Sequence, residues 1–386
     1  MREVVIAGIG QYPVGEHWHL SLRNLSAAAI QAARKDAGGL KPDSIYIGNV
    51  LSPVASHQAN LGALVSDNTF LEGVEACTVE AAEASAAAAF RMAYLAVASG
   101  WVDSSLALGL EKFTDRSGED QNNPIYETLD NDYELNTGSS PTAQAGLLMQ
   151  RYLYEYPHAE RASFAEFPLI AHANAVNNPN AMFRKAMRLE TYQKAGMVAD
   201  PLNIFDVAPY GDGAAALILT TPDIAKDLPH AKVRIIGSNI AIDTLALHDR
   251  SDPLAFRAAG VSLEQACHQA GILPSDADFF ELHDSYSIFA VLSLEAAGFA
   301  EHGEGWRLAQ NNHLSLGGRL PICTMGGLKA RGYPLGATGA YQLVEAVQQL
   351  RGTAGKNQIS NAKRALIQSL GGPASTAVTH VLERME

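Results

Sequence analysis

The chain has 386 residues, of which 47 % are hydrophobic and 18 % are charged, a composition typical of globular proteins with more than one domain. This composition excludes collagen, coiled coils and disordered chains. The formal net charge of −13 would repel a nucleic-acid backbone, and no basic run offsets it, so no nucleic-acid partner is expected. The cysteines, Cys77, Cys267 and Cys323, are too few and too far apart for a disulfide framework, which favours a cytoplasmic location.

No membrane-spanning segment is expected either. The apolar run at residues 1–10 is too short to span a bilayer and lacks a cleavage site of the signal-peptide type. Residues 81–98 are rich in Ala and are the best candidate for a span, but Glu83 and Arg91 lie inside them. Charged residues at these places favour a buried helix of a soluble protein over a membrane span.

The chain repeats itself with an offset of a little over half its length. Short apolar runs of strand type occur at residues 4–10 and again at 233–239. Residues 28–49 and 262–284 both read as an amphipathic helix, a Gly that ends it, a turn with Pro and Asp, and an apolar strand. Self-similarity of this kind indicates two copies of one supersecondary unit.

The same alternation continues around the Ala-rich segment. A strand is predicted after it at residues 106–110, and in the second half a helix at 340–350 precedes a strand at 365–369. Strands that alternate with helices predict parallel or mixed sheets covered by helices.

We therefore expect an N-terminal half at residues 1–225 and a C-terminal half at 230–386, packed as a duplicated α/β/α/β/α five-layer fold about a pseudo-dyad. Residues 112–201 have no counterpart in the second half and are predicted to be an insertion that caps one face. Such an insertion either covers an active site or is a lid of structural value only.

The familiar cofactor motifs are missing. Gly8 and Gly10 follow a strand, but Pro13 stands where a dinucleotide-binding loop has its third glycine. The sequence has no Walker loop, no G-x-S-x-G elbow and no HExxH or Cys-pair spacing. We therefore expect no metal and no bound cofactor.

Cys77 lies in GVEACTVEAAEASAAAAF, directly before the Ala-rich segment. A thiol at a helix N-terminus is stabilised as a thiolate by the dipole and the free backbone amides. The pattern therefore suggests a nucleophile, and the alternative is a cysteine buried in the core.

Motifs in the second half predict the rest of a site. His283 ends an apolar strand in ELHDSYS, where a cleft is commonly found. GGLKARGYPLGATG, at residues 326–339, has the glycine density of a loop that approaches a ligand closely, and SLGGP follows at 369–373. Together with Cys77, these segments predict one site assembled from both halves.

In their order and spacing, these motifs resemble the thiolase superfamily, above all its archaeal and sterol-carrier-protein-associated types. The resemblance implies a homodimer that acts on acyl-CoA thioesters. It implies that Cys77 accepts the acyl group, that His283 helps to hold the enolate, and that backbone amides of Cys77 and of Gly371 or Gly372 hold the thioester oxygen. Coenzyme A would lie along the glycine-rich loop at Gly327, Lys329, Gly332 and Gly336.

The sequence departs from the family pattern at the catalytic bases. The family's G-H-P loop reads Gly332-Tyr333-Pro334 here, and the positions of its second cysteine hold Ser285 and Ser369. A Tyr or Ser of ordinary pKa is a poor base at neutral pH.

Three interpretations follow. The first is a thiolase-type acyltransferase that makes or breaks a C–C bond in acyl-CoA thioesters through Cys77. The second is a thiolase-like retro-aldolase that cleaves a β-hydroxyacyl-CoA of the steroid side-chain type with Tyr333 and Tyr286; enzymes of this kind often need a small partner with an OB-fold and a zinc ribbon. The third is a non-catalytic acyl-CoA-binding subunit. An alternative role for Tyr286 is core packing beside Phe289, and Cys323 is a possible substitute thiol.

Two structural expectations can be checked. Cys77, His283, Tyr333 and Gly371 should converge on one pocket, although they are far apart in the sequence. The strand predicted at residues 106–110 should lie at a sheet edge, in the interface of a homodimer.

Overall fold

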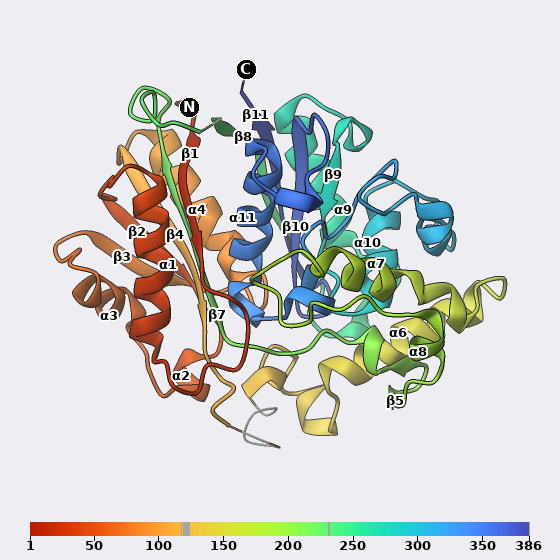
Figure 1. Cartoon of the computed structure of the whole chain (residues 1–386). Helices are drawn as coiled ribbons and strands as arrows, with labels where there is room; N and C mark the ends of the chain where they lie inside the picture. The colour runs from red at the N-terminus through yellow and green to blue at the C-terminus, as the bar shows by residue number, and fades with distance from the viewer. Residues whose placement is uncertain (117, 119–123, 231, 386) are drawn as a thin grey trace.

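The computed structural model describes residues 1–116, 118, 124–230 and 232–385 (Figure 1). Its main sheet has nine strands in the order β3-β2-β4-β7-β1-β8-β11-β10-β9, and β5 and β6 form a separate pair. In chain order the strands are β1 (Val5–Gln11), β2 (Ser44–Gly48), β3 (Glu75–Val79), β4 (Ser104–Glu111), β5 (Met197–Ala199), β6 (Leu202–Asn203), β7 (Gly213–Thr220), β8 (Val233–Ile242), β9 (Phe279–Glu281), β10 (Arg364–Gly371) and β11 (Thr376–Arg384).

The strand order is mirrored about the junction of β1 with β8. Outward from this junction, β7 and β11 run antiparallel to both of their neighbours, and β2 and β9 run parallel to β4 and β10. Beyond β9, a single parallel bridge between Phe280 and Ile322 stands where β3 stands in the first half. The duplication predicted from the sequence repeat is therefore present in the topology.

The helices form three layers around these strands, as Figure 1 shows. On the outer side of the first half lie α1 (Leu22–Asp36) and α3 (Leu61–Asn68); between the halves lie α4 (Ser85–Ser99) and α11 (Thr338–Arg351); outside the second half lie α9 (Arg257–Ala270) and α10 (Ser287–Ala296). The five-layer fold predicted from the sequence is confirmed. Within the described residues, no helix is both long and apolar enough to cross a membrane.

The composition of α4 explains its place at the centre. Its alanines allow strand and helix to approach so closely that a Cβ at Gly48 of β2 would lie 2.3 Å from Cα of Ala86. The larger residues of α4, such as Phe90, join α11 and strands of both halves in one apolar cluster. Gly100, with a φ of +87°, ends the helix in the left-handed conformation that glycine adopts most easily.

The strand predicted at residues 106–110 is not at an edge. It is β4, which pairs with β2 on one side and with β7 on the other. Its eight residues are all buried, as an inner strand between two helix layers requires. The free edge on this side of the sheet belongs to β3, so the predicted place of the 106–110 strand in a dimer interface is wrong.

The segment predicted as an insertion, 112–201, contains helices of its own. They are α6 (Pro141–Glu155), α7 (Glu166–Ala175) and α8 (Leu189–Gln193), which gather at the lower right of Figure 1, below the second half. Residues 117 and 119–123 of this segment lie outside the described residues.

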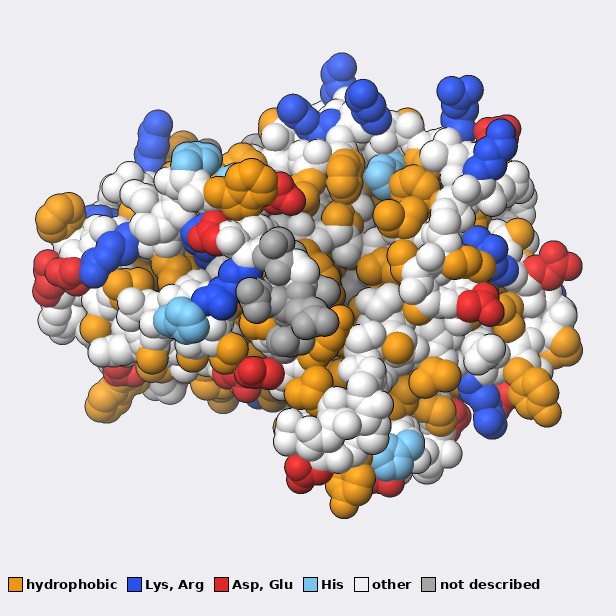
Figure 2. Space-filling model, turned by 90° about the horizontal axis from the view of Figure 1, so that it is seen from below, with side chains coloured by type: hydrophobic (Ala, Val, Ile, Leu, Met, Phe, Trp, Pro, Cys, Tyr) orange, Lys and Arg blue, Asp and Glu red, His pale blue; other side chains and the backbone are white. Residues whose placement is uncertain are grey.

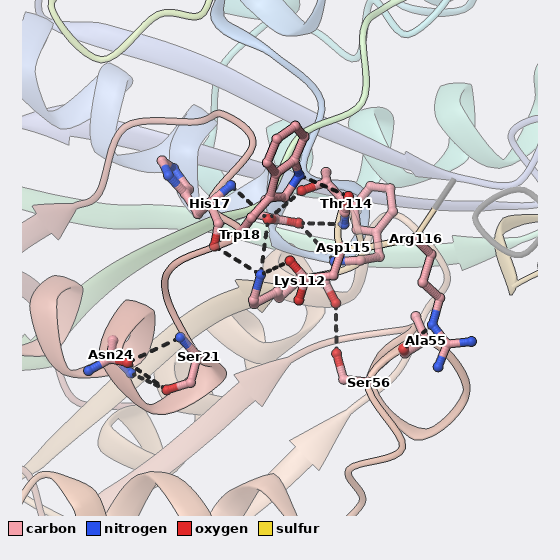
Figure 3. A network of polar contacts seen from close by, with 12 residues as sticks. His17, Trp18, Ser21, Asn24, Ala55, Ser56, Lys112, Thr114, Asp115 and Arg116 are labelled. Carbon is pink, nitrogen blue, oxygen red and sulfur yellow. Dashed lines mark hydrogen bonds and ion pairs between the residues drawn. The ribbon is translucent and has the colours of Figure 1, made fainter. Parts of the chain in front are cut away.

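A buried carboxylate fastens the start of this segment to the chain directly before β7. Asp212, directly before β7, accepts hydrogen bonds from the backbone N–H groups of Phe113 and Thr114, at 2.8 and 3.0 Å, and from the Thr114 hydroxyl at 2.7 Å. Lys112 lies 3.5 Å from the same carboxylate and bonds the carbonyl of His17 (Figure 3). The start of the inserted segment is therefore held at the carboxyl end of β4.

His380 makes the stability of the central layer depend on pH. Its ring lies between Ser238 Oγ and the Ala87 carbonyl, both at 3.1 Å, and burial lowers its pKa to about 3. An unfolded His takes up a proton below about pH 6.5, so this contribution to stability is complete above that pH and is lost as the pH falls towards 3.

We expect the free energy of unfolding to fall by about 1.4 kcal/mol per pH unit in this window because of His380. Urea titrations at pH 7.5 and 5.5 measure it, and His380→Gln, which cannot titrate, should show a smaller fall. An equal fall in the variant would contradict the assignment.

Candidate active site

A narrow cavity of about 10 Å³, room for about one water molecule, lies where the two halves meet the inserted segment. It is lined by Glu83, Pro141, Gln144, Tyr210, Ser285, Tyr286, Phe289, Tyr333, Gly372 and Pro373. Among the predicted site residues, Ser285, Tyr286, Tyr333 and Gly372 are therefore brought together.

Aromatic rings and a histidine make up one side of this cavity. The rings of Tyr210 and Tyr333 are stacked, with centroids 5.7 Å apart. His283 meets Tyr333 edge-on, and its Nε2 atom lies 3.4 Å from the Tyr333 hydroxyl. The Tyr286 hydroxyl lies 3.1 Å from Thr142 Oγ1 of α6. The inserted segment thus supplies part of the site, so it is more than a structural lid.

Backbone pairing places the tyrosines. The chain before β7 forms a bridge from Val207 to Tyr286 and another from Tyr210 to Tyr333. The N–H of Tyr333 donates to the Pro209 carbonyl at 2.8 Å, and the N–H of Gly211 donates to the Tyr333 carbonyl at 3.2 Å. Three distant segments are therefore held in register by main-chain bonds.

Glu83 is the residue at the start of the Ala-rich helix. It precedes Ala84, the N-cap of α4, and is only 4 % exposed. Its Oε2 atom accepts a hydrogen bond from the N–H of Gly372 at 2.6 Å, and Thr128 Oγ1 lies 3.4 Å from Oε1. Burial raises the pKa of this carboxyl above its ordinary value, although the Gly372 bond opposes the shift.

Burial sets the charge states of the other groups. It raises the pKa of Tyr210 and Tyr333 well above the ordinary value, and that of Tyr286 also rises. These phenols therefore stay protonated and can donate hydrogen bonds. Burial, with the charge of Arg331 as a second cause, lowers the pKa of His283 to about 3, so its ring is neutral.

The structure places Cys77 outside this cavity. It lies on the edge strand β3, opposite Tyr46 of β2, and is exposed. The helix predicted to follow it begins only at Ser85, so no helix dipole acts on the thiol. Partial burial and the charge of Glu75 raise its pKa. The predicted convergence of Cys77 with His283 is therefore wrong.

We expect Cys77→Ala to change the turnover of any acyl-CoA substrate by less than about twofold, because the thiol lies outside the cavity and alanine leaves the backbone pairing of β3 unchanged. Steady-state kinetics with the substrate pair described below measures it. A loss of several orders of magnitude would show that the exposed thiol takes part in the reaction.

The other cysteines also lie away from the cavity. Cys323 is buried, its Sγ atom lies 3.8 Å from the Leu282 carbonyl, and burial raises its pKa well above the ordinary value. Cys267 is buried in α9. No cysteine lines the cavity, and the possible substitute thiol at Cys323 is therefore not in place.

An apolar pocket of about 420 Å³ adjoins the cavity and shares Tyr210 with it. Its other lining residues are Thr142, His172, Phe183, Val198, Ile204, Phe205, Val207, Ala208, Pro209 and Lys329. Lys329 donates from Nζ to the Asp206 carbonyl at 2.7 Å, and burial lowers its pKa to about 8. Figure 2 shows the lower face of the molecule, on which hydrophobic side chains are interspersed with charged ones.

The glycines predicted to contact coenzyme A are packed against other parts of the protein. A Cβ at Gly327 would meet the carboxylate of Asp284, one at Gly332 would meet Met182 and Val14, and one at Gly336 would meet Glu111. They serve close packing of the loop and do not line the apolar pocket. Gly371 lies at the end of β10, outside the cavity lining, and only its neighbour Gly372 reaches the cavity.

Sequence reasoning missed Glu83 and Tyr210. The signal for Glu83 was its place directly before the run of small residues Ala84-Ser85-Ala86, which is where α4 begins. Tyr210 carries no local signal, because only the pairing with Tyr333 brings it to the site.

Comparison with known proteins identifies the family of this arrangement. The family model "Thiolase, N-terminal domain" matches residues 4–223, and "Thiolase C-terminal domain-like" matches 240–384. An acetyl-CoA acetyltransferase of Methanothermobacter thermautotrophicus is 38 % identical over the whole of both chains. Sterol carrier protein 2 of Oryctolagus cuniculus is 30 % identical over 84 % of this chain and 63 % of its own.

Solved structures give the same fold. "Ltp2-ChsH2(DUF35) aldolase" matches with a TM-score of 0.85 at 25 % identity, over 99 % of this chain and 98 % of that one. An acetyl-CoA acetyltransferase of Syntrophomonas wolfei matches with a TM-score of 0.75 at 17 % identity, over 99 % of both chains. These matches confirm the predicted family and fold. They agree with the predicted class of thiolase-type acyltransferases, since relatives named acetyl-CoA acetyltransferase are among them, and none of them tests which residue carries the reaction.

Proposed function

Because the chain belongs to the thiolase family, we propose that it makes or breaks a C–C bond beside the carbonyl of an acyl-CoA thioester by an aldol route, without an acyl-cysteine. The observation that carries this proposal is the cavity lining, in which Glu83 stands at the start of α4 and no thiol is present. An acyl-enzyme needs a nucleophile, whereas aldol cleavage of a β-hydroxyacyl-CoA needs only an acid–base pair and a stabilised enolate.

His283 is the proposed donor to the enolate. A neutral imidazole keeps one N–H, and Nε2 lies on the side of the ring that meets Tyr333 of the cavity. A donor aimed at a developing oxyanion in a buried site is worth about 3 kcal/mol. Tyr333 and Tyr286, both protonated, would bind the substrate hydroxyl from the other side.

The apolar pocket is the proposed site of the acyl-CoA arm. Its lining is mostly hydrophobic, and Tyr210 and the Thr142–Tyr286 contact join it to the cavity. Lys329 is the one lysine of its lining and would bind a carbonyl of the arm. Of the predicted CoA contacts, Lys329 alone keeps this role.

We also propose the assembly and the compartment. A second copy of the chain would add its β3 to the free edge of β3, and a small partner is suggested by the aldolase "Ltp2-ChsH2(DUF35)", whose title names a DUF35 component. The duplicated units remain 1–225 and 230–386, and the cytoplasm is the proposed location.

Acyl transfer is the second candidate, favoured by the relatives named acetyl-CoA acetyltransferase at 38 % and 33 % identity. The two candidates differ in one intermediate, an acyl group bound to the enzyme.

The experiment gives the purified protein a β-hydroxyacyl-CoA in one arm and acetoacetyl-CoA with free CoA in the other. We expect a carbonyl product in the first arm and no thiolysis in the second, by chromatography of the CoA esters. Intact mass after incubation with acetyl-CoA should show no adduct. Thiolysis together with an acetyl adduct would support acyl transfer instead.

A further inference from the structure

The cavity needs a group that can take a proton from the substrate and later return it. Its lining offers Glu83, three tyrosines and Ser285, and His283 contacts the lining. The tyrosines hold their protons because burial and the charge of Glu83 raise their pKa. The pKa of His283 near 3 makes its ring a poor base. Serine is weaker still, so the carboxyl is the remaining candidate.

The contacts of Glu83 do not fit those of a helix cap. The N-cap of α4 is Ala84, without a side-chain bond to the free amides of the helix. Glu83 instead binds the N–H of Gly372, which lies in the turn between β10 and β11 of the other half. Only the long contact with Thr128, at 3.4 Å, engages its second oxygen. A buried carboxylate held by one short bond has room to accept a proton on its other oxygen.

We propose that Glu83 is a catalytic residue that carries the proton between the substrate hydroxyl and the α-carbon of the thioester, with Tyr333 of the same cavity lining as the relay. This rests on the proposed function above. The Glu83 carboxyl both accepts the proton in the first step and donates it in the last. His283 acts only as a hydrogen-bond donor.

The proton and the electrons balance within one turnover. In the cleavage direction, the β-hydroxyl loses its proton to the Glu83 carboxylate through a tyrosine hydroxyl. The Cα–Cβ bond breaks, Cβ becomes the carbonyl carbon of the leaving aldehyde or ketone, and the electron pair passes to the thioester as an enolate. Glu83 then gives the proton to Cα, which yields the shortened acyl-CoA and restores the carboxylate. No oxidant or further reactant is required.

The raised pKa of Glu83 agrees with this role, because a carboxyl with a pKa nearer to neutrality binds and releases a proton more readily at working pH. Glu80, on the same loop, is exposed and contributes a second negative charge that raises the pKa further.

The last step, run backwards, gives a direct test: Glu83 should remove an α-proton from the product acyl-CoA. Propionyl-CoA is incubated with the full chain in D₂O, and deuterium at Cα is followed by mass spectrometry. We expect wild type to exchange the α-hydrogen and Glu83→Gln to exchange it at least about 100-fold more slowly, as loss of a general base implies. The amide oxygen of Gln can still accept the Gly372 bond, so the fold is preserved.

The control is Glu72→Gln, an exposed carboxyl eleven residues away that does not act on the pKa of Glu83, and it should exchange at the wild-type rate. Exchange by Glu83→Gln within threefold of wild type would overturn the role of Glu83 and leave the proposed function standing. Cleavage of the β-hydroxyacyl-CoA by wild type without any α-exchange would overturn it as well. Failure of wild type in both assays would overturn the proposed function itself, and the inference with it.

Discussion

Tyr333→Phe is expected to lower the rate of β-hydroxyacyl-CoA cleavage by about 10²–10⁴-fold, the range found for loss of an acid–base group. The change removes one oxygen atom, which lies 3.4 Å from Nε2 of His283, and leaves the ring stacked on Tyr210. The substrate hydroxyl then loses its relay to Glu83, and His283 loses the partner that orients it. Single-turnover kinetics at saturating substrate measures the effect on the chemical step.

Tyr154→Phe is the matched control, because Tyr154 is 80 % exposed on α6 and contributes nothing to the cavity. Its rate should equal that of wild type. If Tyr333→Phe kept more than about a tenth of the activity, the hydroxyl would not be part of the proton path. A parallel fall in substrate affinity alone would assign Tyr333 to binding.

The repeated unit could be predicted from sequence because its signals are local. Gly38 and Gly271 both end helices with positive φ, at +64° and +66°, and an apolar strand follows each. Such stop signals depend on the backbone of a single residue, so they can be recognised in the local sequence. The mirrored order, with five strands in the first half and four strands and a bridge in the second, follows from the repeat of which this signal is a part.

The position of Cys77, the predicted nucleophile, could not be predicted from local signals. The stretch from Glu75 to Ser85 contains residues that fit a strand, a turn and a helix start about equally well, and the structure divides it between β3 and the turn before α4. Cys77 and Glu83 both lie close to the Ala-rich run and only six residues apart, but the end of β3 at Val79 separates them. The sequence around Cys77 fits an exposed thiol on an edge strand as well as a nucleophile, so it does not distinguish the two.

The tyrosine cluster could not be predicted from the sequence without knowledge of the fold. His283, Tyr286 and Tyr333 lie in motifs visible in the sequence, yet Tyr210 joins them only through main-chain pairing across the sheet end. The same pairing explains why Tyr333 is stacked and buried where the family motif carries a histidine. Positions fixed by contacts between distant segments leave no local pattern to read.

Glu83→Cys combined with Tyr333→His, in a Cys77→Ala background, is expected to turn the site into one that takes up an acetyl group. The new thiol would stand at the start of α4, where the helix dipole favours a thiolate. The Gly372 N–H, now bonded to Glu83 at 2.6 Å, would become free to hold the thioester oxygen. A neutral imidazole at 333 supplies a ring nitrogen that can accept the proton of the thiol.

Intact-mass spectrometry after incubation with acetyl-CoA measures the result, and peptide mapping locates the group. We expect an adduct on nearly every molecule at position 83 in the double variant, a slower one with Glu83→Cys alone, and none with Tyr333→His alone, because that variant has no thiol in the cavity. The Cys77→Ala background removes the exposed thiol on β3, so that chance acylation there cannot imitate the signal. A folded double variant without an adduct would show that Glu83 does not stand where a thioester carbon can reach it, and the proton-carrier role would fail for the same reason.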